Sequence, residues 1–247
     1  MSGRTFLIDC GEGTQFSIRA MHINFMRIDH IFISHSHGDH TFGLIGLLST
    51  LSLLGRSTPL TIFCDPDFER MIKSQIEFYI DNMQFELIFR SLRFDKPEVI
   101  LNTKGIIVQS IPLKHRVPTC GFIFREQPHE PNIKKEAIYK YGLTIADIVS
   151  IKGGRPFYDI DGSLIDRKDL VIEAPTPHSY AYISDTCFFP DIVPHISNVS
   201  LLYHEATFAE DCAPLAYKTL HSTAKQAATI ANIIATIFPP FFIIFSY

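Results

Sequence analysis

The sequence lacks the cysteine pattern of a disulfide-bonded or zinc-knuckle protein. Its five cysteines are odd in number and widely scattered, which is typical of a protein from a reducing compartment. The chain also has little excess charge. A formal net charge of −4 argues against a protein that binds nucleic acid over its whole surface, because such binding uses clustered Lys and Arg. A local nucleic-acid site is compatible with this charge.

Long apolar runs and nucleotide-binding fingerprints are missing as well. No apolar signal sequence opens the chain, and the apolar tail 233–247 is broken by Pro239 and Pro240 and falls short of about 18 apolar residues. We therefore expect a cytoplasmic protein without a membrane span, whose tail forms a buried terminal strand. No Gly-x-Gly-x-x-Gly motif follows a predicted strand, which argues against a Rossmann sheet.

The chain does contain an irregular alternation of short apolar runs and helical stretches. Runs typical of buried strands lie at 5–8, 30–33, 60–63, 105–111, 121–124, 181–183 and 199–203. Helical spacing of apolar residues predicts helices over 41–54, 67–82 and 223–235. These elements indicate a single α/β layered domain. Repeated glycines and prolines from about 126 to 168 indicate an inserted excursion.

Four side chains of metal-ligand type directly follow the predicted strand 30–33: His35, His37, Asp39 and His40. In an extended segment His35 and His37 point the same way and can face one metal ion. Asp39 and His40, at the start of the next helix, can face a second. Such ligands suit Zn²⁺ or Mn²⁺, and two ions can hold both the attacking and the leaving oxygen of a phosphodiester. The competing interpretation is a polar loop that is merely rich in histidine.

Further ligands must come from distant loops, and candidates stand at the ends of predicted strands. His115 follows 105–111, Asp185 follows 181–183, and His204 follows 199–203. Taken singly, each residue also fits a helix cap or a hydrogen-bonded surface position. Their shared location after strands favours the metal site.

The segment Ser34 to His40, continued by Thr41 to Leu48, resembles the metal motif of the metallo-β-lactamase superfamily in its ribonuclease Z form. Segments that resemble the same family follow in the same order at 6–15, at 204–207 (His-Glu-Ala-Thr) and at 221–223 (His-Ser-Thr). The resemblance covers most of the chain. It implies an αββα sandwich with an inserted substrate-binding arm at about 126–168, and a substrate that is precursor tRNA.

The resemblance also implies a ligand set for two zinc ions, with manganese as the other candidate. The ligands are His35, His37 and His115 for one ion, Asp39 and His40 for a second, and Asp185 as a bridge between them.

A bridging hydroxide would attack phosphorus and leave a 3′ hydroxyl on the tRNA. Asp39 is the position that the family assigns as proton acceptor. His221, supported by Glu205, would protonate the departing 3′ oxygen. Two roles stay open for His204, namely direct participation in catalysis or a structural hydrogen-bond pair with Glu205 behind the site.

Both ends of the chain depart from the family pattern. The usual opening strand is absent, so we expect an uncovered sheet edge. Near the C-terminus Ile244 stands where the resemblance expects a metal-binding histidine. The second ion would then keep only Asp39, His40 and Asp185, and we expect it to be held more loosely than the first.

The inserted arm bears on both substrate and assembly. Its lysines are interspersed with acidic residues, which weakens the case for phosphate contacts by the arm itself. The resemblance implies a homodimer in which each arm serves the partner subunit. Two other functions stay open: a hydrolase of small esters, thioesters or phosphodiesters with the same fold, and a metal-poor RNA-binding relative. A long excursion favours a macromolecular substrate, and only Ile244 favours the RNA-binding relative.

Overall fold

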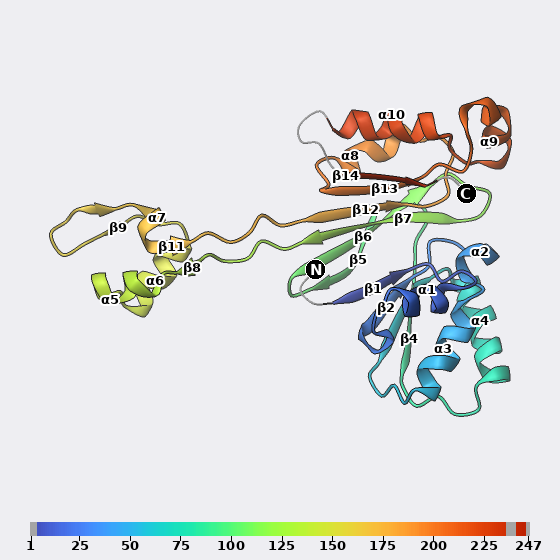
Figure 1. Cartoon of the computed structure of the whole chain (residues 1–247), viewed down its shortest axis with the longest axis horizontal. Helices are drawn as coiled ribbons and strands as arrows, with labels where there is room; N and C mark the ends of the chain where they lie inside the picture. The colour runs from blue at the N-terminus through green and yellow to red at the C-terminus, as the bar shows by residue number, and fades with distance from the viewer. Residues whose placement is uncertain (1–3, 236–240, 246–247) are drawn as a thin grey trace. The chain divides into compact units, whose positions relative to one another are not determined.

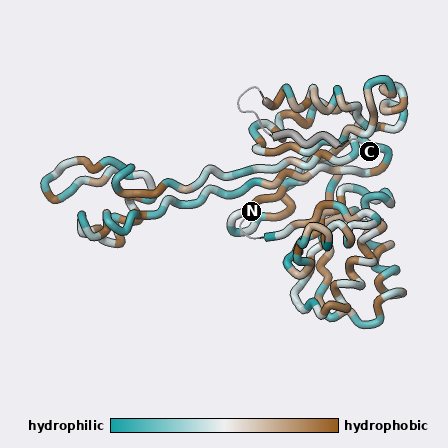
Figure 2. Tube along the Cα trace, in the orientation of Figure 1, coloured by the Kyte–Doolittle hydropathy of each residue, from teal (hydrophilic) through white to brown (hydrophobic). Residues whose placement is uncertain are grey.

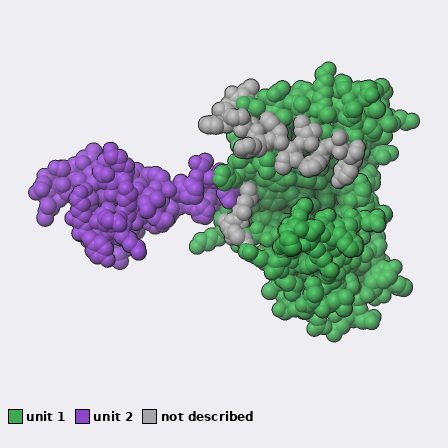
Figure 3. Space-filling model, in the orientation of Figure 1, with its two compact units in different colours: residues 1–125, 178–247 green, residues 126–177 purple. Residues whose placement is uncertain are grey.

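The computed structural model describes residues 4–235 and the backbone of 241–245. The chain divides into two compact units, one formed by 1–125 with 178–247 and the other by 126–177 (Figure 3). Each unit has its own hydrophobic core. Within the described ranges no helix is both long and apolar enough to cross a membrane.

A four-stranded parallel sheet forms one half of the first unit (Figure 1). Its strands, in spatial order, are β1 (Thr5–Ile8), β2 (Ile28–Phe32), β3 (Leu60–Cys64) and β4 (Leu87–Ser91). Its helices are α1 (Thr14–Ala20), α2 (Gly38–Thr41), α3 (Leu44–Leu53) and α4 (Pro66–Tyr79). β1 is an edge strand of this sheet.

A six-stranded sheet forms the other half, in the order β14-β13-β12-β7-β6-β5. The strands are β5 (Glu98–Thr103), β6 (Ile106–Leu113), β7 (Thr119–Glu126), β12 (Ser179–Ile183), β13 (Leu201–Glu205) and β14 (Phe241–Phe245). Strands β12, β13 and β14 are parallel, and β7 runs antiparallel to β12. The helices of this half are α8 (Val193–Ile196), α9 (Ala213–Thr219) and α10 (Ala224–Ile234).

Three hydrophobic clusters divide the first unit into four layers. Leucines of α3 pack on the outer face of the parallel sheet, and Ile230 and Ile234 of α10 pack on the outer face of the mixed sheet. Between the sheets lie aromatic rings such as Phe32 and Phe63, which stack with centroids 4.8 Å apart. Figure 2 shows the apolar residues concentrated along these strands and helices. The αββα sandwich expected from the sequence is therefore confirmed.

The second unit, 126–177, is built from short elements around its own small core. Two two-stranded ribbons pair β8 (Asn132–Ile133) with β11 (Val171–Ile172) and β9 (Phe157–Tyr158) with β10 (Leu164–Ile165). The helices are α5 (Lys135–Tyr141), α6 (Ile145–Lys152) and α7 (Arg167–Leu170). Thr144 and Asp147 form a reciprocal capping box at the start of α6, which satisfies backbone N–H groups that would otherwise lack partners.

Candidate metal centre

The candidate ligands lie in the loops after strands of both sheets and in the short helix α2. His35 and His37 occupy the loop after β2, and Asp39 and His40 lie in α2. The mixed sheet supplies ligands from the loops after its own strands: His115 after β6 and Asp185 after β12. The backbone turns after β2, β6 and β12 thus carry distant parts of the sequence to one place.

Three imidazole nitrogens and one carboxylate oxygen converge within this region. His37 Nδ1 lies 3.1 Å from His35 Nε2 and 3.3 Å from His115 Nε2. Asp185 Oδ2 lies 3.6 Å and 3.7 Å from the same two Nε2 atoms. One ligand atom from each of the four residues fits within 4.8 Å of all the others. This donor set and spacing suit a tetrahedral metal ion such as Zn²⁺.

Hydrogen bonds behind the rings favour neutral imidazoles whose Nε2 lone pairs face the centre. His35 Nδ1 donates to Ser34 Oγ at 3.0 Å, and His115 Nδ1 donates to the Leu220 carbonyl at 2.9 Å. Burial, with the neighbouring His40, lowers the pKa of His35 to about 3, and burial also lowers the pKa of His115. A neutral, oriented imidazole is the form that binds a metal ion.

A second group surrounds His40. Its Nε2 lies 3.5 Å from Asp39 Oδ2 and 3.5 Å from Asp185 Oδ1, so the two oxygens of Asp185 face different groups. Burial acts to lower the pKa of His40, but contacts with Asp185 and Asp9 outweigh it and raise that pKa to about 10. Burial likewise acts to raise the pKa of Asp185, yet His40 brings it to about 2. The carboxylates therefore hold a positive charge at a place where a divalent ion could replace the proton.

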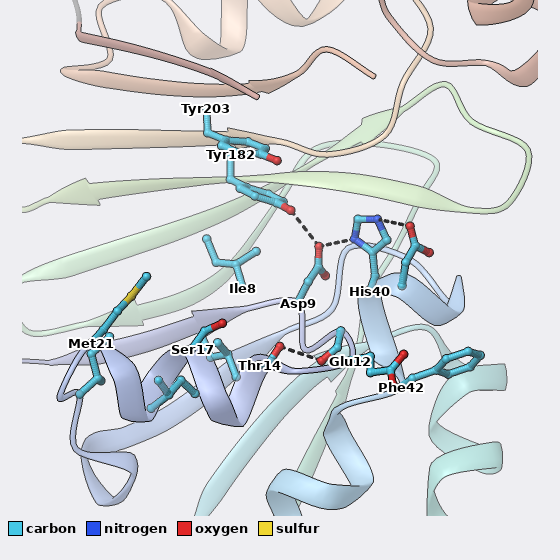
Figure 4. A pocket seen from close by; sticks show the side chains of 15 residues that line it. Ile8, Asp9, Glu12, Thr14, Ser17, Met21, His40, Phe42, Tyr182 and Tyr203 are labelled. Carbon is cyan, nitrogen blue, oxygen red and sulfur yellow. Dashed lines mark hydrogen bonds and ion pairs between the residues drawn. The ribbon is translucent and has the colours of Figure 1, made fainter. Parts of the chain in front are cut away.

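Asp9 orients His40, and the sequence analysis did not single it out. Its Oδ2 accepts hydrogen bonds from His40 Nδ1 at 2.8 Å and from Tyr182 Oη at 3.0 Å (Figure 4). The same oxygen accepts a hydrogen bond from Ser34 Oγ at 2.8 Å. Its Oδ1 accepts a fourth from the Ser34 backbone N–H at 2.7 Å. The only indication in the sequence was its place directly after the strand 5–8, because loops after strands carry the other functional residues.

His221 faces the same centre from the loop after α9, with Nε2 3.8 Å from Asp185 Oδ2. Its Nδ1 donates to Glu205 Oε1 at 3.1 Å. Glu205 is itself held by backbone N–H groups of Thr186, Thr207 and Ser222. Burial acts to lower the pKa of His221, but the Glu205 carboxylate outweighs it and raises that pKa. His221 is thus oriented and able to carry a proton beside the ligand cluster.

The structure does not bring His204 to this cluster. The sequence analysis expected it after a strand, but β13 extends through Glu205, and neighbouring residues of a strand point to opposite faces. Its Nδ1 donates to the Glu205 carbonyl at 2.7 Å, while Nε2 is buried without a hydrogen-bond partner among the described residues. In backbone register His204 pairs with Ile244, whose side chain lies outside the described residues.

Two cavities open beside the ligands and share Asp39. The smaller, of about 460 Å³, is lined by His37, Gly38, Asp39, Arg116, Asp185, Thr207 and His221. The larger, of about 810 Å³, extends past His40 to the stacked rings of Tyr182 and Tyr203 (Figure 4). The smaller cavity is where a substrate could meet both the ligand cluster and His221.

A close backbone contact between Gly11 and Asp39 supports the second group of ligands, so a substitution of Gly11 can test that support. A Cβ built on Gly11 would lie 2.0 Å from the carbonyl oxygen of Asp39. We expect Gly11→Ala to displace α2 and to weaken metal binding by about 10- to 100-fold, as loss of a supporting contact does elsewhere. Zinc titration of the purified variant measures this effect.

The matched control is Gly153→Ala in the second unit, where an added Cβ meets only ordinary contacts at 3.4 Å. It should bind zinc as the unmodified chain does. Equal zinc affinities for the two variants would contradict the role assigned to the Gly11 contact.

Comparison with known proteins gives relatives over most of the chain. The family model described as Anti-Pycsar protein Apyc1 matches residues 1–129. Ribonuclease Z of Phocaeicola vulgatus is 41% identical over 229 residues, which cover 93% of this chain and 74% of that protein. Ribonuclease Z of Parabacteroides distasonis is 43% identical over 228 residues, which cover 92% of this chain and 75% of that protein.

Among solved structures, the short form of human tRNase Z has a TM-score of 0.68 at 23% identity. The match covers 95% of this chain and 79% of the human chain, and it shows a shared fold. The family assignment rests on the two bacterial relatives, because each alignment covers most of this chain and most of the relative. The ligand loops described above all lie within the span of this similarity, and the chain belongs to the ribonuclease Z family.

Proposed function

We propose that this chain is a metal-dependent endoribonuclease that removes the 3′ trailer from precursor tRNA. One observation carries the proposal: a four-residue metal-ligand group lies beside a histidine that a buried carboxylate orients. The names of the bacterial relatives and of the human structure support tRNA as the substrate. The cellular compartment and the number of subunits, which we predict to be the cytoplasm and two, rest on the family resemblance.

We assign the metal ligands as the sequence analysis did, with zinc as the expected ion and manganese as the alternative. His35, His37 and His115 hold one ion, Asp39 and His40 a second, and Asp185 lies between the two groups. When bound, two ions would activate water and neutralise charge that develops on the phosphate. Asp9, through its contact with His40 Nδ1, fixes the direction of the His40 lone pair.

Two side chains beside these ligands, Asp39 and His221, are placed to transfer protons. Asp39, whose side chain is 77% exposed and lines both cavities, is placed to accept a proton from water. His221 holds a proton with the help of Glu205 and is placed to give it to the departing 3′ oxygen. For His204 we propose the structural role, because it faces away from the cluster and, among the described residues, forms a hydrogen bond with the Glu205 backbone alone.

Hydrolysis assays with three substrates, together with a binding assay for the precursor, separate this function from its alternatives. A trailer-bearing precursor tRNA, a small activated phosphodiester and a thioester are each incubated with Zn²⁺, with Mn²⁺ and with a chelator. We expect metal-dependent cleavage of the precursor at the end of the tRNA. A chain that hydrolyses only the small substrates would be the small-ester hydrolase, and one that binds the precursor without metal-dependent cleavage would be the RNA-binding relative.

Removal of the second unit is expected to affect the two phosphodiesters differently. Arg125 and Ser179 are cross-strand partners in β7 and β12, so a two-residue hairpin turn can replace 126–178 between them. The shortened chain should lose activity on precursor tRNA, since contacts distant from the reacting bond are missing. Hydrolysis of the small diester should persist, because the ligands all belong to the first unit. Equal losses on both substrates would mean that the second unit serves only to stabilise the fold.

Metal content tests the effect of Ile244. If the second ion has three ligands, the unmodified chain should retain one ion after exhaustive dialysis and lose the other. Ile244→His should raise the content towards two ions per chain and increase the rate of phosphodiester hydrolysis. The control is Ile160→His, which adds a histidine at a fully exposed position of the second unit. Two firmly held ions in the unmodified chain would show that another residue supplies the ligand that a histidine at position 244 would provide.

A further inference from the structure

The guanidinium of Arg116 is a positive charge at the site that has no role in the function proposed above. Arg116 directly follows the ligand His115 in the loop between β6 and β7, and its side chain is exposed. It lines the 460 Å³ cavity together with Thr207 and His221. The structure records no hydrogen bond or ion pair for its guanidinium among the described residues. The neighbouring cation, Lys114, by contrast lies 4.1 Å from the centroid of the Phe189 ring.

Two carboxylates, Asp39 and Asp185, line the same cavity as Arg116, and both face histidines. Asp185 faces four histidines, and Asp39 Oδ2 lies 3.5 Å from His40 Nε2. The charge of Arg116 also acts to lower the pKa of His221, so the two groups lie within electrostatic reach of each other. Arg116 therefore supplies a positive charge to the wall of this cavity, beside His221, where it can attract an anion.

The direction of the substrate follows from the proposed role of His221. The ligand cluster holds the scissile phosphate, and His221 marks the side on which the 3′ oxygen departs. The nucleoside that carries this oxygen therefore lies on the His221 side of the cavity. Its own 5′ phosphate is the next anion along the strand, and Arg116 is an exposed cation that lines the same cavity as His221. A planar guanidinium can donate two parallel hydrogen bonds to such a phosphate.

We propose, on the basis of the function proposed above, that Arg116 forms a second phosphate subsite, which binds the phosphate immediately 5′ to the cleaved bond on the retained RNA. The subsite distinguishes a polynucleotide from a small phosphodiester, because a small diester has no second phosphate. The subsite also positions the 3′ oxygen beside His221, so it favours binding of the RNA strand in the one polarity that leads to cleavage.

Substitution of Arg116 should separate these substrates. Arg116→Ala should lower kcat/KM for precursor tRNA by about 10- to 100-fold, the range for loss of a charged hydrogen bond, and Arg116→Lys should recover part of it. Hydrolysis of a small activated phosphodiester should not change. The control is Arg90→Ala, which removes the same charge from an exposed position of β4. It should leave both substrates unaffected.

A single neutral phosphate in the substrate provides the decisive comparison. A precursor with a methylphosphonate one nucleotide 5′ to the cleaved bond should be cleaved by the unmodified protein as slowly as Arg116→Ala cleaves the normal precursor. Arg116→Ala should cleave both precursors at the same rate. Equal sensitivity of the two proteins to the methylphosphonate would overturn the subsite, and so would a loss on the small diester, which would place Arg116 at the scissile phosphate. If the unmodified protein cleaves no precursor while it hydrolyses the small diester, the proposed function is wrong and the subsite with it.

Discussion

Asp185→Asn is expected to abolish cleavage of precursor tRNA and to lower the metal content of the protein. The two oxygens of Asp185 face different groups, with Oδ1 3.5 Å from His40 and Oδ2 3.6 Å from His35. Asparagine keeps the shape but replaces one oxygen by an amide NH₂, which donates hydrogen bonds and does not bind cations. Loss of even a supporting residue costs about 10- to 100-fold in metal affinity or activity, and loss of a shared ligand should cost more.

The control for this prediction is Asp191→Asn, which removes a carboxylate from an exposed position shortly after β12. It should retain both metal and activity. Metal analysis after dialysis and single-turnover cleavage measure the two effects on the same preparations. Full metal content together with full activity in Asp185→Asn would contradict the assignment of this carboxylate as the bridge.

His221→Ala is expected to slow cleavage of precursor tRNA by about 10²- to 10⁴-fold, the usual contribution of a positioned general acid. The departing 3′ oxygen of RNA is strongly basic and needs a proton as it leaves. A 4-nitrophenolate leaving group is stable without a proton, so hydrolysis of a 4-nitrophenyl phosphodiester should be much less affected. Metal content should stay unchanged, because the Nε2 atom of His221 lies 3.8 Å from Asp185 and outside the four-residue ligand group.

His195→Ala serves as the control, because His195 lies on α8 in the outer helical layer. This variant should cleave both substrates as the unmodified chain does. Equal losses on the precursor and on the 4-nitrophenyl diester in His221→Ala would exclude the general-acid role and would favour a contribution of His221 to the ligand cluster itself.

The sequence allowed prediction of the residues that the structure brings together as candidate ligands. His35, His37, His115 and Asp185 were selected because they follow apolar strands, and the structure places them within one group. We could infer that these residues lie close together, because loops at strand ends meet at one edge of a layered fold.

Features that depend on tertiary packing were not predictable from the sequence. Asp9 orients His40 across 31 positions of sequence, and a lone aspartate after a strand carries no sign of that partner. The face occupied by His204 depends on where β13 ends, and a two-residue difference in that end decides whether the residue lies in the strand or after it. Strands β4 and β5 were missed because their residues are mostly half-buried or exposed, without the apolar run that marks a buried strand.

Cleavage of a trailer-bearing precursor tRNA in oxygen-18 water, followed by analysis of both new ends, tests the central proposal most directly. If metal-activated water attacks phosphorus and His221 protonates the leaving oxygen, the tRNA ends in an unlabelled 3′ hydroxyl. The trailer then begins with a 5′ phosphate that carries one heavy oxygen, and a chelator prevents the reaction. A 2′,3′-cyclic phosphate on the tRNA, or cleavage that persists in the chelator, would contradict the proposal.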